Sequence, residues 1–155
     1  MIATTHLITG AVVGALCPNW WLAAILAILL HYLLDAVPHK DFDDDKGFQI
    51  NAPIIADGVF GLLIIFLFYF FGKHNFNLVW GAFFGLLPDM FAVAMMIFTP
   101  KIWASNWHTR FMRTLHWFDY SRFKLKNPPS VRVSVAYQVV IWVVCFLILF
   151  LNHTL

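Results

Sequence analysis

Glutamate is absent from this 155-residue sequence, and charged residues of all kinds make up only 12% of it. Hydrophobic residues make up 61%, and the mean hydropathy is +0.77. A soluble domain usually carries about a quarter charged residues, so the composition excludes that class. We therefore interpret the chain as an integral membrane protein.

Cysteine is also scarce. Cys17 and Cys145 lie in or beside apolar runs and have no CxxC spacing. We interpret both as small membrane-buried residues, which excludes a disulfide framework and a thiolate zinc pair. The chain also lacks a basic stretch before its first apolar segment, because its first lysine is Lys40. This pattern favours a helix of the mature protein over a cleaved signal peptide.

Apolar segments predict an all-α fold with about five transmembrane or membrane-embedded helices in a single membrane domain, residues 1–155. These helices are expected over about 2–16, 20–37, 52–71, 78–99 and 131–151. The first is short for a full span, and the last carries almost no polar groups, which is typical of a packing helix without chemistry. In the segment 101–120, basic residues alternate with aromatic and aliphatic ones, which predicts an amphipathic helix lying at the membrane interface.

Basic residues predict the orientation. If the stretch 101–132 is cytoplasmic, only Lys73 of the ten basic residues falls on the far side. This distribution places the N-terminus in the cytoplasm and the C-terminus outside. We expect the protein in a prokaryotic cytoplasmic (inner) membrane.

Ionisable residues interrupt the second apolar segment. His31 and Asp35 are four residues apart, so on a helix they project from one face about one turn apart, where two side chains can share a metal ion. Pro38 ends the helix and leaves His39 just beyond it. Burying an imidazole and a carboxylate alone is costly, and a divalent cation is their simplest partner.

Glycines indicate which way other ionisable residues face. Three sets share a four-residue spacing: His6, Gly10 and Gly14; Asp57 and Gly61; Gly81, Gly85 and Asp89. Small residues at this spacing form the surface along which membrane helices approach closely, so these ionisable groups are expected to point into the bundle. The alternative is ordinary glycine-mediated packing with incidental polar neighbours.

The candidate ligands offer nitrogen and oxygen but no thiolate, which suits one or two divalent ions, zinc first, with manganese or iron as alternatives. They are His6, His31, Asp35, His39, Asp57 and Asp89. His108 and His116 are further candidates because they lie on one face of the predicted interfacial helix. Contact with lipid head groups is the alternative for these two.

Three short motifs carry a resemblance: Thr-Thr-His6-Leu-Ile-Thr-Gly10, His31-x3-Asp35-x2-Pro38-His39 and Leu-Leu-Pro88-Asp89. Together they resemble a family of small bacterial and archaeal membrane-bound metal-dependent hydrolases. The His-x3-Asp element is also similar to the metal pair of zinc-dependent phospholipase C and of the single-strand-specific zinc nucleases, which split phosphoesters. No second such element follows, so the resemblance implies one or two metals rather than three.

These features favour a metal-dependent hydrolase acting near the cytoplasmic leaflet on a phospholipid or another lipid-linked or phosphorylated substrate. Asp89 and Asp57 are the catalytic candidates, as ligand or general base. Arg110 and Arg113 are candidates for binding the substrate phosphate, with anchoring on anionic lipid as the alternative.

Other function classes stay open. The same residues suit a metal or proton transporter, or a metal-binding membrane protein without turnover, and a haem held by two histidines is a third class. Nucleic-acid binding is not expected, because the basic residues are explained by topology. Nothing in the sequence indicates the oligomeric state.

Overall fold

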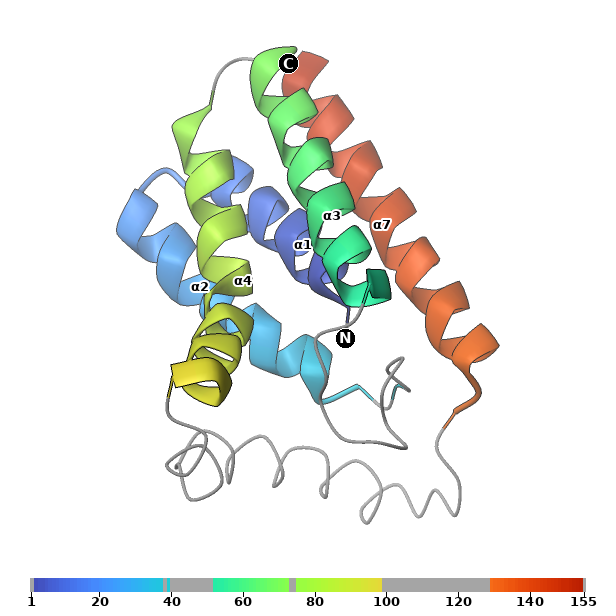
Figure 1. Cartoon of the computed structure of the whole chain (residues 1–155). Helices are drawn as coiled ribbons and strands as arrows, with labels where there is room; N and C mark the ends of the chain where they lie inside the picture. The colour runs from blue at the N-terminus through green and yellow to red at the C-terminus, as the bar shows by residue number, and fades with distance from the viewer. Residues whose placement is uncertain (1, 38, 40–51, 73–74, 99–128, 155) are drawn as a thin grey trace.

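A computed structural model describes residues 2–37, 39, 52–72, 75–98 and 129–154 (Figure 1). Within these residues the chain forms five helices and no strand. They are α1 (Ala3–Leu16), α2 (Trp20–Asp35), α3 (Ala52–Phe70), α4 (Phe76–Phe98) and α7 (Val131–Thr154). The ranges expected from the sequence differ from these bounds by at most three residues. The predicted interfacial helix, 101–120, lies outside the described residues.

Three of these helices, α3, α4 and α7, are long and apolar enough to cross a membrane. Their most apolar windows have mean hydropathies of 2.2, 1.5 and 2.5. Helices α1 and α2 have only 14 and 16 residues and fall short of the usual span. The structure therefore supports an all-α protein with three candidate spans and two shorter apolar helices.

The short helix α1 is the centre of the bundle. It contacts each of the other four helices, and its contact with α4 is the most extensive (Figure 1). Ten of its 14 residues are buried. Because protein rather than lipid covers α1, the thickness of the bilayer does not set its length.

Glycines let α1 and α4 approach closely. A Cβ atom added at Gly10 or Gly14 would meet the backbone of α4, and one added at Gly81 would meet the backbone of α1. At Gly85 the added atom would lie 2.5 Å from the carbonyl oxygen of His6. The predicted glycine-mediated contact is confirmed for this helix pair.

Helix α2 has its large apolar side chains on the outside. Its buried residues are small or ionisable: Ala23, Ala24, Ala27, His31 and Asp35. Its exposed residues are large and apolar: Trp20, Trp21, Ile25, Leu26, Leu29 and Leu33. A helix of a soluble protein shows the opposite arrangement. The outer face of α2 therefore suits lipid, although the helix is short.

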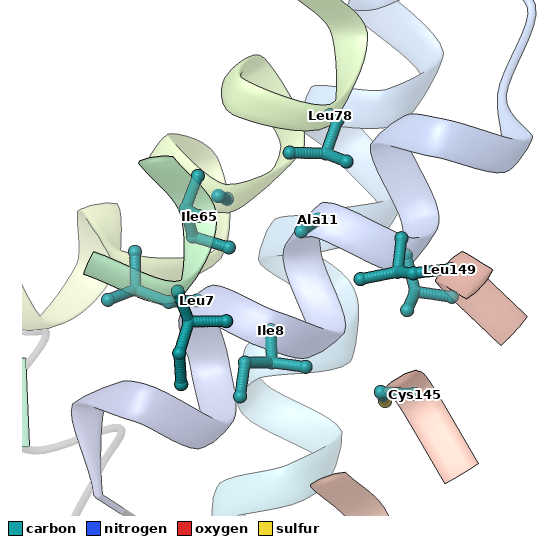
Figure 2. Packing of buried hydrophobic residues seen from close by; sticks show 10 residues of the cluster. Leu7, Ile8, Ala11, Ile65, Leu78, Cys145 and Leu149 are labelled. Atoms are coloured by element: carbon teal, nitrogen blue, oxygen red, sulfur yellow. The ribbon is translucent and has the colours of Figure 1, made fainter. Parts of the chain in front are cut away.

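Apolar side chains of α3, α4 and α7 pack against those of α1 (Figure 2). Leu7, Ile8 and Ala11 of α1 lie among Ile65 of α3, Leu78 of α4, and Cys145 and Leu149 of α7. The thiol of Cys145 is therefore one more apolar group in the core, as the sequence predicts, whereas Cys17 is half-buried. This packing holds α3, α7 and the first part of α4 against α1, and the later part of α4 meets α1 and α2 around Gly85.

Candidate metal site

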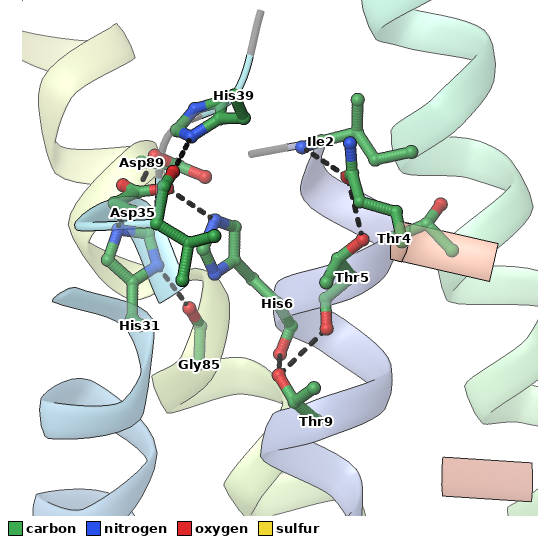
Figure 3. Close-up of polar contacts among 12 residues, drawn as sticks. Ile2, Thr4, Thr5, His6, Thr9, His31, Asp35, His39, Gly85 and Asp89 are labelled. Atoms are coloured by element: carbon green, nitrogen blue, oxygen red, sulfur yellow. Dashed lines mark hydrogen bonds and ion pairs between the residues drawn. The ribbon is translucent and has the colours of Figure 1, made fainter. Parts of the chain in front are cut away.

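Four ionisable side chains meet where α1, α2 and α4 come together, and we call them the His–Asp cluster: His6, His31, Asp35 and Asp89 (Figure 3). The Asp35 carboxylate contacts the Nε2 atoms of both imidazoles. Its Oδ1 is 3.1 Å from Nε2 of His6, and its Oδ2 is 3.3 Å from Nε2 of His31. Oδ1 of Asp89 is 3.7 Å from the same His31 nitrogen.

Local sequence explains this convergence. His31 and Asp35 are one turn apart at the end of α2, so both face the bundle. On α4, Gly85 lies one turn before Asp89, and its carbonyl oxygen accepts a hydrogen bond of 2.8 Å from Nδ1 of His31. The same glycine lets the backbone of His6 approach. One turn of α4 therefore positions both histidines beside Asp89.

The hydrogen bond to Gly85 fixes the proton on His31. A carbonyl oxygen only accepts, so Nδ1 carries the hydrogen, and in a neutral ring Nε2 then holds a lone pair. That nitrogen is buried without a hydrogen-bond partner, and it faces Asp35 and Asp89. A lone pair directed at two carboxylates is repelled, so this position requires a proton or a metal cation.

His6 also has a buried ring nitrogen without a hydrogen-bond partner. Its Nε2 donates to Oδ1 of Asp35 at 3.1 Å, so a neutral ring carries a lone pair on Nδ1. Nδ1 is also buried without a hydrogen-bond partner. The two imidazole rings lie nearly face to face, with centroids 3.9 Å apart and planes tilted by 32°. Two unsatisfied ring nitrogens in one small cluster are the donor set that a divalent cation uses.

Distances in the cluster suit a single metal ion. His6, His31 and Asp89 each offer a ligand atom, and these atoms lie within 4.8 Å of one another. Nitrogen and oxygen ligands about 2.1 Å from a tetrahedral zinc stand about 3.3 Å apart. Nε2 of His31 is separated from the carboxylate oxygens of Asp35 and Asp89 by 3.3 and 3.7 Å, which are of that size. These three residues could hold a metal, with Asp35 as a fourth ligand or as the group that orients both imidazoles.

His39, another predicted ligand, is also buried, with 3% of its surface exposed. Its Nδ1 donates to the carbonyl oxygen of Val37 at 2.7 Å (Figure 3). A metal ion would therefore have to bind His39 through Nε2.

The structure does not bring Asp57 into the cluster. Oδ2 of Asp57 accepts a hydrogen bond from the backbone nitrogen of Thr4 at 3.1 Å, and its carbonyl oxygen accepts one from the Thr4 hydroxyl at 2.7 Å. Thr4 and His6 are two residues apart, about 200° around the helix. Asp57 therefore holds the start of α1 from the side opposite to the His–Asp cluster.

Helix α7 packs against α1 partly through buried hydrogen bonds, which were not expected from the sequence. Gln138 is buried, and its Oε1 accepts from the backbone nitrogen of Ile2 at 3.2 Å and from the Thr5 hydroxyl at 3.0 Å. Its Nε2 donates to the carbonyl oxygen of Ser134 at 3.1 Å. Nε1 of Trp142 donates to the Thr5 hydroxyl at 2.9 Å. The sequence signal was Ser134 and Gln138, which share the four-residue spacing that we used elsewhere.

We call this second group the Thr–Gln cluster: Thr4, Thr5, Asp57, Gln138 and Trp142. The other predicted site residues, His108, His116, Arg110 and Arg113, lie outside the described residues. No protein-family model, curated protein or solved structure matches this chain.

Proposed function

We propose that the protein is a membrane-embedded metal-dependent hydrolase whose metal ion is held by the His–Asp cluster. One observation carries the proposal: two buried imidazole nitrogens of the cluster have no hydrogen-bond partner, and one of them, Nε2 of His31, lies 3.3 Å from Asp35 and 3.7 Å from Asp89. Zinc is the expected ion, with manganese or iron as alternatives, because the donors are nitrogen and oxygen only.

The uneven burial of the cluster favours a catalytic over a structural metal site. The side chain of Asp89 is 37% exposed, whereas those of His6, His31 and Asp35 are at most 4% exposed. Structural zinc sites are closed by four protein ligands, and catalytic ones keep one position open to water or substrate. The Asp89 side is the open one here.

Each residue then has a role. A divalent ion at this site would supply a Lewis acid and lower the pKa of a bound water to about 7. Asp35 contacts both imidazoles and holds them in one orientation. Asp89 is both close to His31 and open, so it is the candidate for a metal ligand or for the general base. Asp57 was the other catalytic candidate. Because it is hydrogen-bonded to Thr4, away from the His–Asp cluster, we propose no catalytic role for it.

The expected substrate is a phospholipid or a lipid-linked phosphate. Large apolar side chains cover the outer face of α2, which puts hydrocarbon next to the helix that carries His31 and Asp35. Arg110 and Arg113 remain the proposed phosphate ligands, and the cytoplasmic leaflet remains the expected side. A transporter is less well supported, because a transport pathway needs polar groups along the depth of the membrane. The titratable residues of the cluster instead meet at one level of α1, and the part of α1 that follows is packed through glycines.

Elemental analysis of the protein purified in detergent without chelators tests the metal site. We expect about one zinc, manganese or iron per chain in the wild type and less than a tenth of that in His31→Ala and Asp89→Ala. Asn152→Ala is the matched control, since Asn152 lies on α7 and its amide donates to the carbonyl oxygen of Ala15. No metal in folded wild type after reconstitution, or equal metal in all four proteins, would overturn the site.

Turnover needs a separate assay. The metal-loaded protein should hydrolyse a fluorescent phospholipid in mixed micelles, and Asp89→Ala should reduce the rate at least 100-fold. If metal binds but no phosphoester tested is cleaved, the hydrolase proposal fails and a non-catalytic metal-binding protein remains.

A further inference from the structure

The start of α1 is held by other helices rather than by its own residues. Ile2 is the N-cap residue and makes no side-chain cap hydrogen bond. The first backbone N–H groups of any helix need acceptors from elsewhere. Here the N–H of Thr4 uses Asp57 of α3, and the N–H of Ile2 uses Gln138 of α7. Two neighbouring helices thus fix the first turn of α1.

Thr5 is the most tightly constrained residue of this turn. Its side chain is completely buried, its hydroxyl donates to Oε1 of Gln138 at 3.0 Å, and the same hydroxyl accepts from Nε1 of Trp142 at 2.9 Å. Gln138 is itself held by its bond to Ser134. Both the donor and an acceptor position of the Thr5 hydroxyl are therefore used.

The contact between α1 and α4 does not supply the same constraint. Glycine surfaces permit close approach but are smooth and offer no side chain that fixes rotation or sliding. A shift of α1 by about 1 Å would be enough to spoil a metal site, whose ligands must lie within about 0.5 Å of their productive positions. Thr5 directly precedes His6 in the chain.

We infer that Thr5 and Gln138 are positioning residues, which fix the rotation and axial position of α1 and thereby hold His6 at the metal-binding geometry of the His–Asp cluster. This inference rests on the proposed metal site. It assigns a role in that site to α7, a helix that contributes no member of the His–Asp cluster.

The test compares two substitutions at one position. Thr5→Val keeps the shape of the side chain and removes the hydroxyl, whereas Thr5→Ser retains the hydroxyl. We expect Thr5→Val to weaken zinc affinity about 10- to 100-fold, as loss of a supporting group typically does, and to change the visible spectrum of the Co²⁺-substituted protein. Thr5→Ser should restore both to nearly wild-type values. Affinity is measured by competition with a chromogenic chelator, and metal-free melting temperature is recorded for each protein.

Asn152→Leu is the matched control, because it breaks a hydrogen bond between α7 and α1 at the other end of α1. It should lower the melting temperature and leave zinc affinity within twofold of the wild type. If Thr5→Val melts at a lower temperature but binds zinc with wild-type affinity and spectrum, Thr5 is merely structural and the inference is overturned.

Two further outcomes are decisive. Gln138→Leu removes the same hydrogen bond from the α7 side, so it replaces Thr5→Val if that variant does not fold, and wild-type zinc affinity in it would equally overturn the inference. If the wild type and Asn152→Leu bind no zinc, the proposed metal site fails, and this inference fails with it. Zinc binding that is normal in the wild type and unchanged in Thr5→Val rejects the positioning role alone.

Discussion

Two buried polar clusters lie on different sides of the same helix, and they differ in how completely their groups are paired. The Thr–Gln cluster joins α1 to α3 and α7, and its donors at Thr4, Thr5, Gln138 and Trp142 all have acceptors. The His–Asp cluster joins α1 to α2 and α4 and leaves Nδ1 of His6 and Nε2 of His31 without hydrogen-bond partners.

Under the proposed function, this difference separates a structural from a functional use of polarity. An unsatisfied buried polar atom costs about 1–3 kcal/mol. The donors of the Thr–Gln cluster are paired, whereas elsewhere in the described part of the bundle Nε1 of Trp80 is also buried without a hydrogen-bond partner. The His–Asp cluster retains two unpaired nitrogens within the same fold, which is the pattern expected where a ligand completes the pairing.

The largest expected effect is loss of both clusters at once. Gly81→Leu places a side chain against the backbone of Gly10 and Gly14, so α1 and α4 must separate. We expect no folded, monodisperse protein by size-exclusion chromatography and circular dichroism in detergent. Gly58→Leu is the control, because a Cβ atom there meets nothing within 4 Å, and it should behave as the wild type. A folded Gly81→Leu protein that retains metal would contradict the central place given to this contact.

An intermediate effect should distinguish two aspartates that the sequence ranks equally. Asp89→Asn removes a carboxylate from the His–Asp cluster, so metal affinity should fall at least 10-fold. Asp57→Asn leaves an amide oxygen that can still accept from Thr4, so metal affinity should stay within threefold of the wild type. Chelator competition measures both. Equal losses in the two variants would return Asp57 to the ligand set.

The smallest effect should appear within the satisfied cluster. Trp142→Phe removes the hydrogen bond to the Thr5 hydroxyl, so the free energy of unfolding should fall by about 1 kcal/mol. Zinc affinity should not change, since Thr5 keeps its bond to Gln138. Unfolding in detergent with increasing denaturant gives the stability, and Trp21→Phe, at an exposed position, is the control. A large loss of metal binding in Trp142→Phe would show that the two clusters are less separate than we describe.

The sequence predicted what depends on local spacing. Helix positions follow from the apolar segments, and the shared face of His31 and Asp35 and the glycine contact between α1 and α4 follow from a period of about 3.6 residues. Spacing could not separate Asp57 from Asp89, because each lies four residues from a glycine. Which side of α1 a neighbouring helix occupies decides their roles, and that is a property of the whole bundle.

Two other features also depend on the whole bundle. The average hydrophobicity of α7 concealed Gln138, whose importance depends on a partner 133 residues away. Of the five expected helices, three are long and apolar enough to cross a membrane, whereas α1 is enclosed by protein and can be short.

The bond between Thr5 and Gln138 also has a consequence for biosynthesis. Its two residues are separated by 133 positions, so a ribosome needs on the order of 10 s to make the chain between them. Until α7 is made, the Thr5 hydroxyl and the backbone N–H of Ile2 lack their acceptor, Gln138. The hydrogen bonds at the first turn of the central helix are thus complete only after α7 has been made.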